Sequence, residues 1–594
     1  MTRKQHFFKE ATSTFIAVRL VSALPPLEWL RSYSRGSLIN DGLAAIIVTI
    51  MLIPQSLAYA LLAGLPAEMG LYASILPLIA YALFGSSRTL SVGPVAVASL
   101  MTASAVGAVA SQGVVDYASA ATLLALLGGL MLIAMGLLKF GLVSHFLSQP
   151  VVSGFITGSA IIIALGQLGP LLGIALKGAT LPSLGHDLFM QIREGHSLTI
   201  AVGSGSVAFL LLARYRLSRW LGALGLRGRP AELIVRSAPV LVMAVLIPLS
   251  AAMSFESAGV PLVGQIPSGL PAFSAPNISW LLIQELALPA FLIALIGFIE
   301  SVSVGKTLGA RRRQRIDPDQ ELIGLGAANT AAAISGGFPV TGGFSRSVVN
   351  FDAGAETQMA SVLAALGIAL AAVLLTPMLY FLPRAVLAAT IVVAVISLID
   401  FETITLARRY RAADFWAVVI TINVTLLAGV EMGVLAGVGA SVGLHLYHTS
   451  RPHFAVVGQV PESEHYRNVE RHDVMTDPHI LSMRIDESLY FANAAYLEDM
   501  MFAQAALRED LLHVILMCPA VNAIDLSALE ALEEINTRLK ESDIALHLSE
   551  VKGPVMDALE RSDFLNHLSG EIFLSHHHAV MALSTKETAG PALT

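Results

Sequence analysis

The sequence predicts a multi-pass α-helical membrane protein of about fourteen segments, followed by a smaller cytoplasmic α/β domain. Three observations predict this organisation. Apolar runs long enough to cross a bilayer recur from residue 38 to residue 450, only 13% of the 594 residues are charged, and the composition becomes polar after Arg451. Because about a quarter of the residues in a soluble domain are charged, and this chain has a mean hydropathy of +0.70, most of the chain belongs in a bilayer.

The composition also excludes several classes of protein. The net charge is -7, yet the basic residues cluster in particular loops, and nothing in the sequence indicates a nucleic-acid surface. The single cysteine, Cys518, excludes an intrachain disulfide framework and a cysteine-rich metal site. The basic N-terminus lacks a short apolar core followed by a cleavage site, so we expect no signal peptide. We expect neither a cofactor nor a bound metal.

Residues 1–37 are polar to amphipathic, and we expect them in the cytoplasm and along the membrane surface. The apolar runs that follow predict a transmembrane domain over residues 38–450, at about 20 residues per crossing. The predicted spans are 38–62, 69–86, 118–139, 150–173, 197–215, 232–252, 285–309, 321–337, 357–380, 383–399, 413–429 and 431–448, together with two short segments interrupted by glycine and proline, 90–110 and 338–352. All should be helical, because unpaired backbone groups are costly in lipid.

Loop charges support this count. Cytoplasmic loops of membrane proteins are enriched in lysine and arginine. The loops after even-numbered crossings contain Arg88, Lys139, Arg214, Arg216, Arg219, Arg227, Arg229, Arg311, Arg312, Arg313, Arg315, Arg408, Arg409 and Arg411. The opposite loops contain Lys177, Arg193 and Arg384, with the acids Glu68, Asp116, Asp187 and Glu256. Both termini are therefore predicted to lie in the cytoplasm.

Residues 451–594 follow a different pattern, which predicts a separate domain with a flexible tail. After the polar stretch PESEHYRNVERHDVMTDP, apolar strand-like runs (HILSMRI, HVILMCPAVNAI, IALHLSEV) alternate with helical ones (SLYFANAAYLEDMMFAQAALRE, SALEALEEINTRLKES, GPVMDALERSDFL). Strands that alternate with helices predict an α/β unit with a mainly parallel sheet, and about 140 residues suffice for one domain.

The stretch from Glu285 to Phe351 contains the most informative residues. Its first apolar run carries a carboxylate, Glu300, near the middle, and a charge there costs about 2.5 to 3.5 kcal/mol on insertion scales. The later segment GGFPVTGGFSRSVVNF places glycines and a proline beside Arg346 at membrane depth. A backbone broken in this way is tolerated only where protein encloses it or where it lines a cavity. We therefore predict half of an anion site and its coupling group here.

The membrane region also divides into similar halves. A span with the helix-breaking pair Pro54 and Gln55 is followed two crossings later by LSVGPVAVASLM, and the span with Glu300 is followed two crossings later by FPVTGGFSRSVVN. Paired interrupted segments at matching places in two halves indicate a transporter binding site near the midplane. Seven crossings per half would make the two repeats inverted. Alternatively, the glycines and prolines reflect only their ordinary frequency in membrane helices.

Three separated motifs resemble one known family. LIPQSLAYALLAGLPAEMGLYASILPLIAYALFGSSRTLSVGPVAVASLM resembles the signature region of the SulP sulfate-permease family of anion transporters, and FPVTGGFSRSVVN resembles its second interrupted segment. The C-terminal unit, with NAIDLSALEAL, is similar to a STAS domain, the module related to anti-sigma-factor antagonists. This resemblance implies a seven-plus-seven inverted-repeat fold with core and gate subdomains. It also implies a homodimer that moves anions such as sulfate, bicarbonate, chloride or dicarboxylates.

The resemblance implies an anion site between the two interrupted segments. Helix N-termini present unpaired N–H groups and about half a positive charge, so two of them can hold an anion together. The implied site residues are Val92, Gly93, Val95 and Ala96 from the first segment, Gly342, Gly343, Phe344, Ser345 and Arg346 from the second, and Gln55 and Tyr59 from the first span. Ordinary hydrogen bonding between helices is the alternative for Gln55 and Tyr59.

The resemblance implies that Glu300 stands at the position of the acid that couples transport to a cation in this family. Members that resemble sodium-coupled carriers have an aspartate there and a hydroxyl residue four positions later, whereas this chain has Val304. Glu300 instead resembles the acid of proton-coupled sulfate carriers, and an apolar environment favours its neutral form. The alternative is a structural ion pair between Glu300 and Arg346, and both arrangements could occur in alternate states.

Other motifs are weaker. VGKT at residues 304–307 lacks the glycine that a phosphate-binding loop needs, because that position is Glu300 within a hydrophobic run. His576, His577 and His578 could bind a metal, but adjacent histidines near a tail are more often solvated. Ser527 is placed to cap a helix, and it matches the serine that is phosphorylated in the anti-sigma antagonists, so regulation is the second possibility.

We therefore expect a secondary active transporter, not an enzyme, in the inner membrane. It would import sulfate or a similar oxyanion with protons by alternating access, with membrane lipid around it and a regulatory protein as a possible partner of the STAS domain. A bicarbonate or dicarboxylate carrier, or an anion exchanger, is the alternative within the same class. From another class, the chain could be a membrane-tethered regulator, although an anchor alone has no reason to keep Glu300 and Arg346 in the bilayer.

Overall fold

The computed structural model describes residues 25–30, 33–110, 116–145, 148–176, 178–223, 225, 231, 234–235, 237–267, 269–271, 273, 276 and 278–588. Most of the predicted segment 1–37, and the end of the predicted tail, lie outside these residues. The chain divides into two compact units, residues 1–441 and 442–594. The predicted domain boundary after residue 450 remains a prediction.

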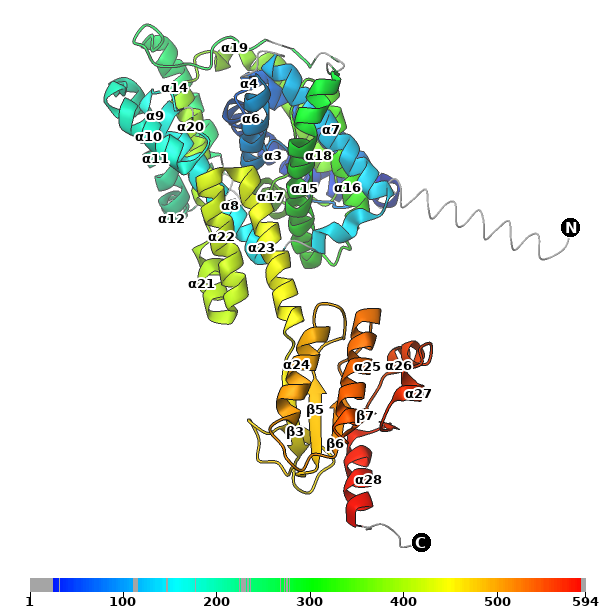
Figure 1. Ribbon diagram of the computed structural model, residues 1–594. Helices are drawn as coiled ribbons and strands as arrows, with labels where there is room; N and C mark the ends of the chain where they lie inside the picture. Colours follow the sequence, from blue (N-terminus) through cyan, green and yellow to red (C-terminus); the bar gives the residue numbers. More distant parts are fainter. Residues whose placement is uncertain are drawn as a thin grey trace, which may run out of the picture. The chain divides into compact units, whose positions relative to one another are not determined.

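The first unit is built from helices (Figure 1). They are α2 (Pro26–Leu30), α3 (Arg35–Leu62), α4 (Ala67–Tyr72), α5 (Leu76–Phe84), α6 (Ala96–Ala110), α7 (Tyr117–Leu137), η1 (Phe140–His145), α8 (Gln149–Gly166), α9 (Leu168–Leu172), α10 (Leu181–Gln191), η2 (Ile192–Glu194), α11 (Ser197–Leu212), η3 (Ala213–Leu217), α12 (Ser218–Ala223), α14 (Ala238–Ala252), α15 (Trp280–Arg311), α16 (Pro318–Ile334), α17 (Phe344–Asp352), α18 (Met359–Leu374), α19 (Thr376–Leu379), α20 (Arg384–Ile396), α21 (Phe401–Tyr410), α22 (Ala412–Ala428) and α23 (Val430–Ser450). Two short strands, β1 (Val92–Gly93) and β2 (Thr341–Gly342), complete the unit.

Within the described residues, eight helices are long and apolar enough to cross a membrane. Four shorter apolar helices are Ala96–Val109, Ala238–Ala252, Met359–Leu374 and Ala412–Ala428. The predicted run 69–86 is broken between α4 and α5, and the run 150–173 is broken between α8 and α9. The membrane fold is confirmed, whereas the count of fourteen crossings remains a prediction.

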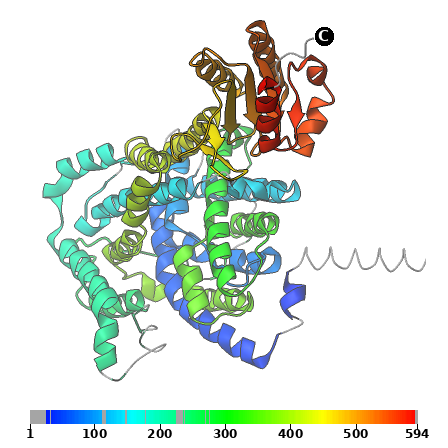
Figure 2. The same cartoon turned by 90° about the horizontal axis from the view of Figure 1, so that it is seen from below.

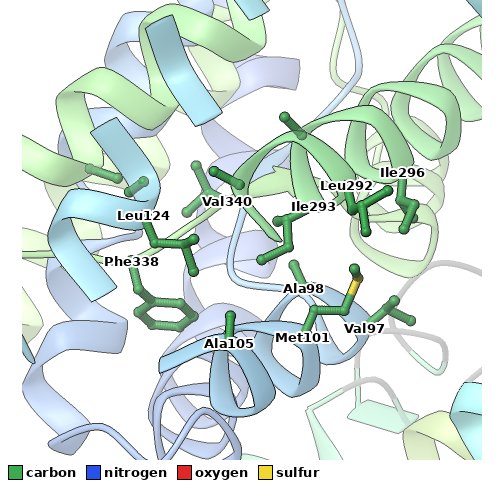
Figure 3. Packing of buried hydrophobic residues seen from close by; sticks show 14 of the residues in the cluster. Val97, Ala98, Met101, Ala105, Leu124, Leu292, Ile293, Ile296, Phe338 and Val340 are labelled. Atoms are coloured by element: carbon green, nitrogen blue, oxygen red, sulfur yellow. The ribbon is translucent and has the colours of Figure 1, made fainter. Parts of the chain in front are cut away.

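Close packing of α6, α7, α15 and α16 forms one side of the unit, and α11, α14 and α20 lie together elsewhere in it. Small residues allow this packing: a Cβ atom on Gly129 of α7 would lie 2.8 Å from the backbone nitrogen of Thr330 in α16. Figure 3 shows the side chains between α6 and α15, where Ala98 and Met101 of α6 lie near Ile293 of α15. This packing gives the segments that carry the candidate site a rigid support.

The second unit is an α/β domain, as predicted. Its six-stranded sheet has the order β4-β3-β5-β6-β7-β8. The strands are β3 (Phe454–Gln459), β4 (Tyr466–Asn468), β5 (Ile480–Ile485), β6 (His513–Met517), β7 (Ala545–Ser549) and β8 (Ile572–Phe573). The pairs from β5 to β8 are parallel, and β3 pairs antiparallel with β4 and β5. Helices α24 (Ala494–Ala505), α25 (Leu526–Glu541), α26 (Gly553–Leu559) and α27 (Phe564–His567) accompany the sheet (Figure 2).

The expectation that the adjacent histidines 576–578 are solvated is wrong in part. They begin a further helix, α28 (His576–Thr588), in which His578 is exposed and His576 is not. Ala579 and Leu583 of this helix pack on Ile480 and Ile515 of the sheet. His576 is therefore buried, with 1% of its surface exposed. The apolar residues of α28 form one short run, from Ala579 to Leu583, which does not repeat at a helical period, so the helix was not predicted.

Candidate functional site

The two interrupted segments meet inside the first unit. Strands β1 and β2 pair antiparallel, with Val92 opposite Gly342 and Gly93 opposite Thr341, and all four residues are buried. Helix α6 begins at Ala96 and α17 begins at Phe344, so both helix N-termini follow directly from the paired strands. Each terminus presents backbone N–H groups that have no partner within the helix. The arrangement is therefore able to hold an anion.

Side chains of the second half hold the backbone of the first segment. The Asn350 side chain donates to the carbonyl oxygen of Thr89 at 3.0 Å, and the backbone N–H of Ser91 donates to the Ser347 hydroxyl at 3.0 Å. The Gln358 side chain donates to the carbonyl oxygen of Leu90 at 2.9 Å. These bonds satisfy polar groups that lipid could not satisfy, and they fix β1 relative to α17.

The second segment is held in the same way by helices α15 and α16. The backbone N–H of Gly342 donates to the Ser301 hydroxyl at 2.9 Å, and Ser301 directly follows Glu300 in α15. Asn329 of α16 both donates to the carbonyl of Val340 and accepts from its N–H, each at 2.9 Å. Any movement of β2 is therefore shared with the helix that carries Glu300.

A large cavity of about 890 Å³ lies beside the paired strands. It brings together five of the predicted site residues: its lining includes Gln55, Val95, Glu300, Phe344 and Ser345. The remaining residues of the predicted anion site do not line the cavity. They are Tyr59, Val92, Gly93, Ala96, Gly342, Gly343 and Arg346, and all are buried.

Arg346 is buried and is not among the residues that line the cavity, whereas the cation Arg214 does line it. The Arg346 side chain folds back over two glycines: a Cβ on Gly93 would lie 2.5 Å from Nη1, and one on Gly343 would lie 2.9 Å from Nε. Only 2% of Arg346 is exposed, Nη2 donates to the Thr341 carbonyl at a long 3.4 Å, and Nη1 has no hydrogen-bond partner. The buried charge therefore acts on the paired strands at short range.

Glu300 reaches the cavity from α15. Among the described residues, no hydrogen bond or ion pair fixes its carboxyl group, although the charge of Arg346 acts on it. The structural ion pair between Glu300 and Arg346 is therefore absent from this conformation. Val304 lines the cavity one turn further along α15, and so do Ser303 and Thr307. The position where a sodium carrier would place a hydroxyl group is apolar.

Glu321, which we did not predict as a functional residue, has the opposite environment. It is fully buried on α16, where one carboxyl oxygen accepts from the Ser86 N–H (2.8 Å), the Ser86 hydroxyl (2.7 Å) and the Ser87 N–H (2.9 Å). The other oxygen accepts from the Tyr81 hydroxyl at 2.7 Å. Glu321 thus fixes the loop that leads from α5 to β1.

The sequence also missed most polar residues of the cavity wall. They are Gln149, Ser153, Arg214, Ser303, Thr307, Thr390, Ser397, Asp400 and Thr403. Asp400 carries a visible signal, because an aspartate three residues before a threonine is typical of a helix N-cap, and it does cap α21. The others are scattered among helices that only the folded chain brings together.

Ser527 is not a helix cap. Asp525 caps α25 instead: one of its carboxyl oxygens accepts from the Ala528 N–H at 2.9 Å, and the other accepts from the Phe491 N–H at 2.8 Å. A carboxylate is at least as good a cap as a hydroxyl, and it lies one position earlier than Leu526, the first helical residue. Ser527 lies exposed in the first turn. Its predicted regulatory role remains a prediction.

Two broken helices that meet beside a polar cavity with an intramembrane carboxyl define a membrane transport protein, not an enzyme. The comparisons with known proteins agree. The model of the sulfate permease family matches residues 38–421, and the STAS domain model matches residues 471–579. The chain belongs to the sulfate permease family of membrane anion transporters and carries a C-terminal STAS domain.

Relatives cover nearly the whole chain. It is 33% identical over 588 residues to sulfate transporter 4.1, chloroplastic, of Arabidopsis thaliana, covering 96% of this chain and 84% of that protein. It is also 33% identical over 566 residues to a probable sulfate transporter of Mycobacterium tuberculosis, covering 94% and 97%.

Solved structures show the same fold. SLC26A9 gives a TM-score of 0.88 at 23% identity, covering 97% of this chain and 95% of that one. The transmembrane domain of a cyanobacterium bicarbonate transporter, BicA, gives a TM-score of 0.58 at 22% identity, covering 69% and 99%.

Proposed function

We propose that this protein is a secondary active transporter that takes up sulfate, or a similar oxyanion, together with protons by alternating access. The observation that carries the proposal is the pairing of β1 with β2 beside a cavity that also reaches Glu300. The names of the relatives, which are sulfate transporters, favour sulfate as the anion.

The anion would bind where α6 and α17 begin. Ser345 offers a hydroxyl donor in the cavity wall, and the helix N-termini offer backbone N–H groups. Arg346 would add its charge from its buried position beside Gly93 and Gly343, and Gln55 a polar contact from α3. A site made mainly of dipoles and one buried cation can release its ion, which a transporter requires.

Glu300 would couple the anion to a proton. No donor fixes its carboxyl group in this conformation, and the small void on one side of it is otherwise lined by valine, isoleucine and phenylalanine, so protonation would remove a poorly compensated charge. Protonation would also relieve the repulsion between Glu300 and a bound dianion. Val304 supports protons over sodium, because a sodium ion would need further oxygen ligands at that place.

Alternating access would require the cavity to open to one membrane face at a time. Gln149, at the start of α8, and Asp400, which caps α21, line the cavity. The sequence places those helix ends on the cytoplasmic side, so this conformation would be the inward-facing one. We place the protein in the inner membrane as a homodimer with both termini in the cytoplasm and the STAS domain available to a regulatory protein.

Uptake by the purified protein in liposomes tests the proposal. An inward proton gradient should drive the accumulation of radiolabelled sulfate, whereas a sodium gradient at equal pH should not. Unlabelled sulfate should compete better than bicarbonate, chloride or fumarate. Stronger competition by bicarbonate or fumarate would show that the preferred substrate is that anion rather than sulfate. Sodium-driven uptake would overturn the proton coupling. The absence of any uptake would favour a membrane-tethered regulator.

A further inference from the structure

A second carboxyl group lies within the membrane unit, on α23. Glu431 is partly buried, and its Oε1 atom is enclosed without a hydrogen-bond partner. The one polar side chain that acts on it is Ser104 of α6, and among the described residues no cation, histidine or other acid does so. An enclosed carboxyl oxygen without a donor is costly, so its presence calls for a reason.

Helix geometry places Glu431 away from the large cavity. Ser104 is about two turns, or about 12 Å, further along α6 than Ala96, where the anion site would lie. The cavity reaches this region only at Val95 and Val97, close to the start of α6. Glu431 therefore acts about two turns of α6 away from the candidate site, and the predicted topology puts the start of the last span, 431–448, towards the non-cytoplasmic face.

Glu300 nevertheless faces α23, the helix that carries Glu431. Val434 is one turn from Glu431 on one face of α23, and it lines a small void of about 20 Å³ together with Glu300. The rest of the void is lined by valine, isoleucine and phenylalanine side chains of α8 and α15, including Phe155 and Ile296. Glu300 thus touches two spaces: the open cavity on one side, and an apolar gap towards Glu431 on the other.

Stabilisation of a helix N-terminus does not account for this arrangement. Glu431 lies in the first turn of α23, where a negative charge is favoured. The helix dipole favours a negative charge without any need to enclose it, whereas Oε1 of Glu431 is enclosed and accepts no hydrogen bond from the described residues.

We propose that Glu431 is a second protonation site, which takes up protons from the membrane face opposite the cavity and passes them to Glu300. In the transfer, the O–H bond of the Glu431 carboxyl breaks and the proton binds a carboxylate oxygen of Glu300, so Glu431 becomes ionised and Glu300 neutral. The void could hold one water molecule by volume, but among the described residues Glu300 is its one polar lining side chain. The dry gap blocks transfer in this conformation, and movement of α8 and α23 opens it.

This inference rests on the proposed proton coupling, and one experiment separates the two. Full-length Glu431→Gln protein in liposomes is compared with wild type for sulfate uptake over a range of external pH and for sulfate–sulfate exchange without a gradient. Gradient-driven uptake should fall by on the order of tenfold at neutral external pH, recover towards wild type at acidic external pH, and leave exchange intact. In contrast, Glu300→Gln should lose driven uptake at every pH.

Two further variants make the result decisive. Glu431→Asp keeps an ionisable group and should retain the wild-type pH profile, whereas Glu285→Gln alters an exposed carboxyl of α15 and should change nothing. A Glu431→Gln profile that equals wild type, or a Glu431→Asp loss as large as that of Glu431→Gln, would overturn the relay and leave a structural residue. Wild-type uptake that ignores protons would instead overturn the proposed function itself.

Discussion

Glu300 and Glu321 lie on consecutive helices of one membrane unit, and their carboxyl groups have opposite hydrogen-bonding environments. Four donors surround Glu321, which is fully buried between α16 and the loop before β1. Glu300 faces a cavity and, within the described residues, accepts no hydrogen bond. Both acids fall within predicted spans, Glu300 inside one and Glu321 at the first position of the next, and hydropathy alone does not predict how either carboxyl group is bound.

The difference separates a structural acid from a mobile one. The donors of Glu321 fix its position and tie α5, α16 and the start of β1 into one body. The carboxyl of Glu300 is free to change its proton and its rotamer. Buried polar groups that are fully satisfied add rigidity, whereas an unsatisfied one marks a place where a ligand, an ion or a proton acts.

The largest effect is expected at Glu321. Replacing it with alanine leaves the Tyr81 hydroxyl and the N–H groups of Ser86 and Ser87 without their acceptor. We expect a loss of about 3 to 5 kcal/mol of stability, with transport lost because the fold is lost. Thermal unfolding in detergent measures it, and Glu285→Ala on the exposed end of α15 is the control. An unchanged melting temperature would show that Glu321 is not a structural acid and does not differ from Glu300 in this respect.

Glu300→Gln should leave the fold intact and remove coupling. Because no donor depends on this carboxyl, the melting temperature should stay within about 1 °C of wild type, as for an exposed substitution. Proton-driven accumulation of sulfate should fall by on the order of 100-fold, while exchange continues. Accumulation and exchange are measured side by side in liposomes. Undiminished accumulation would show that the proton binds elsewhere.

Sequence patterns predicted the helices well, because the length and hydropathy of a span are local properties. The break between α4 and α5 and the small elements β4, β8 and α28 were missed, since each is stabilised by packing rather than by its own pattern. The two interrupted segments were predicted to meet as helix starts, but the pairing of β1 with β2 was not predicted. The side-chain directions were not predicted either: Arg346 folds over Gly343, three residues earlier, and over Gly93 of the other segment, because neither glycine has a side chain.

The same limit explains the acids. Glu300 was visible in the middle of a span, whereas Glu321 and Glu431 lie near the ends of predicted spans, where acids are common. Their different roles depend on donors from other helices, namely Tyr81 for one and Ser104 for the other. Such long-range partners cannot be derived from a single sequence.

Arg346→Ala tests whether a buried charge that does not line the cavity contributes to anion binding. We expect sulfate affinity to fall by about tenfold, or about 1.4 kcal/mol, because the buried charge no longer acts on the paired strands. Equilibrium binding of sulfate to the purified protein measures the change. Gly93→Ala is the matched variant: its Cβ would lie 2.5 Å from Nη1 and should displace the intact arginine with a similar loss. Unchanged affinity in both variants would make Arg346 structural, like Glu321.

In the second unit, His576 is intermediate between Glu300 and Glu321, because only one of its two ring nitrogens has a hydrogen-bond partner among the described residues. Its Nδ1 pairs with the Ser549 hydroxyl at 2.9 Å, whereas Nε2 is buried without a partner. Burial, with a smaller effect of the neighbouring His577, lowers the pKa of His576 from 6.5 to about 4. Its contribution to stability is therefore complete above the unfolded pKa and is lost as the pH falls from 6.5 towards 4.

Between pH 7 and about pH 5.5, this loss should amount to about 1 kcal/mol, the smallest effect considered. It should appear as faster hydrogen exchange along α28 in the full-length protein. His576→Gln should flatten the pH dependence because the side chain no longer titrates, and His465→Gln, at an exposed histidine, should leave it unchanged. If the hydrogen-exchange rate of α28 depends on pH equally in wild type and in His576→Gln, Nε2 of His576 has a hydrogen-bond partner in solution. A single missing hydrogen bond, such as that of His576 Nε2, would then not show that a buried group is mobile. The difference between Glu300 and Glu321 would depend on the presence or absence of all four donors.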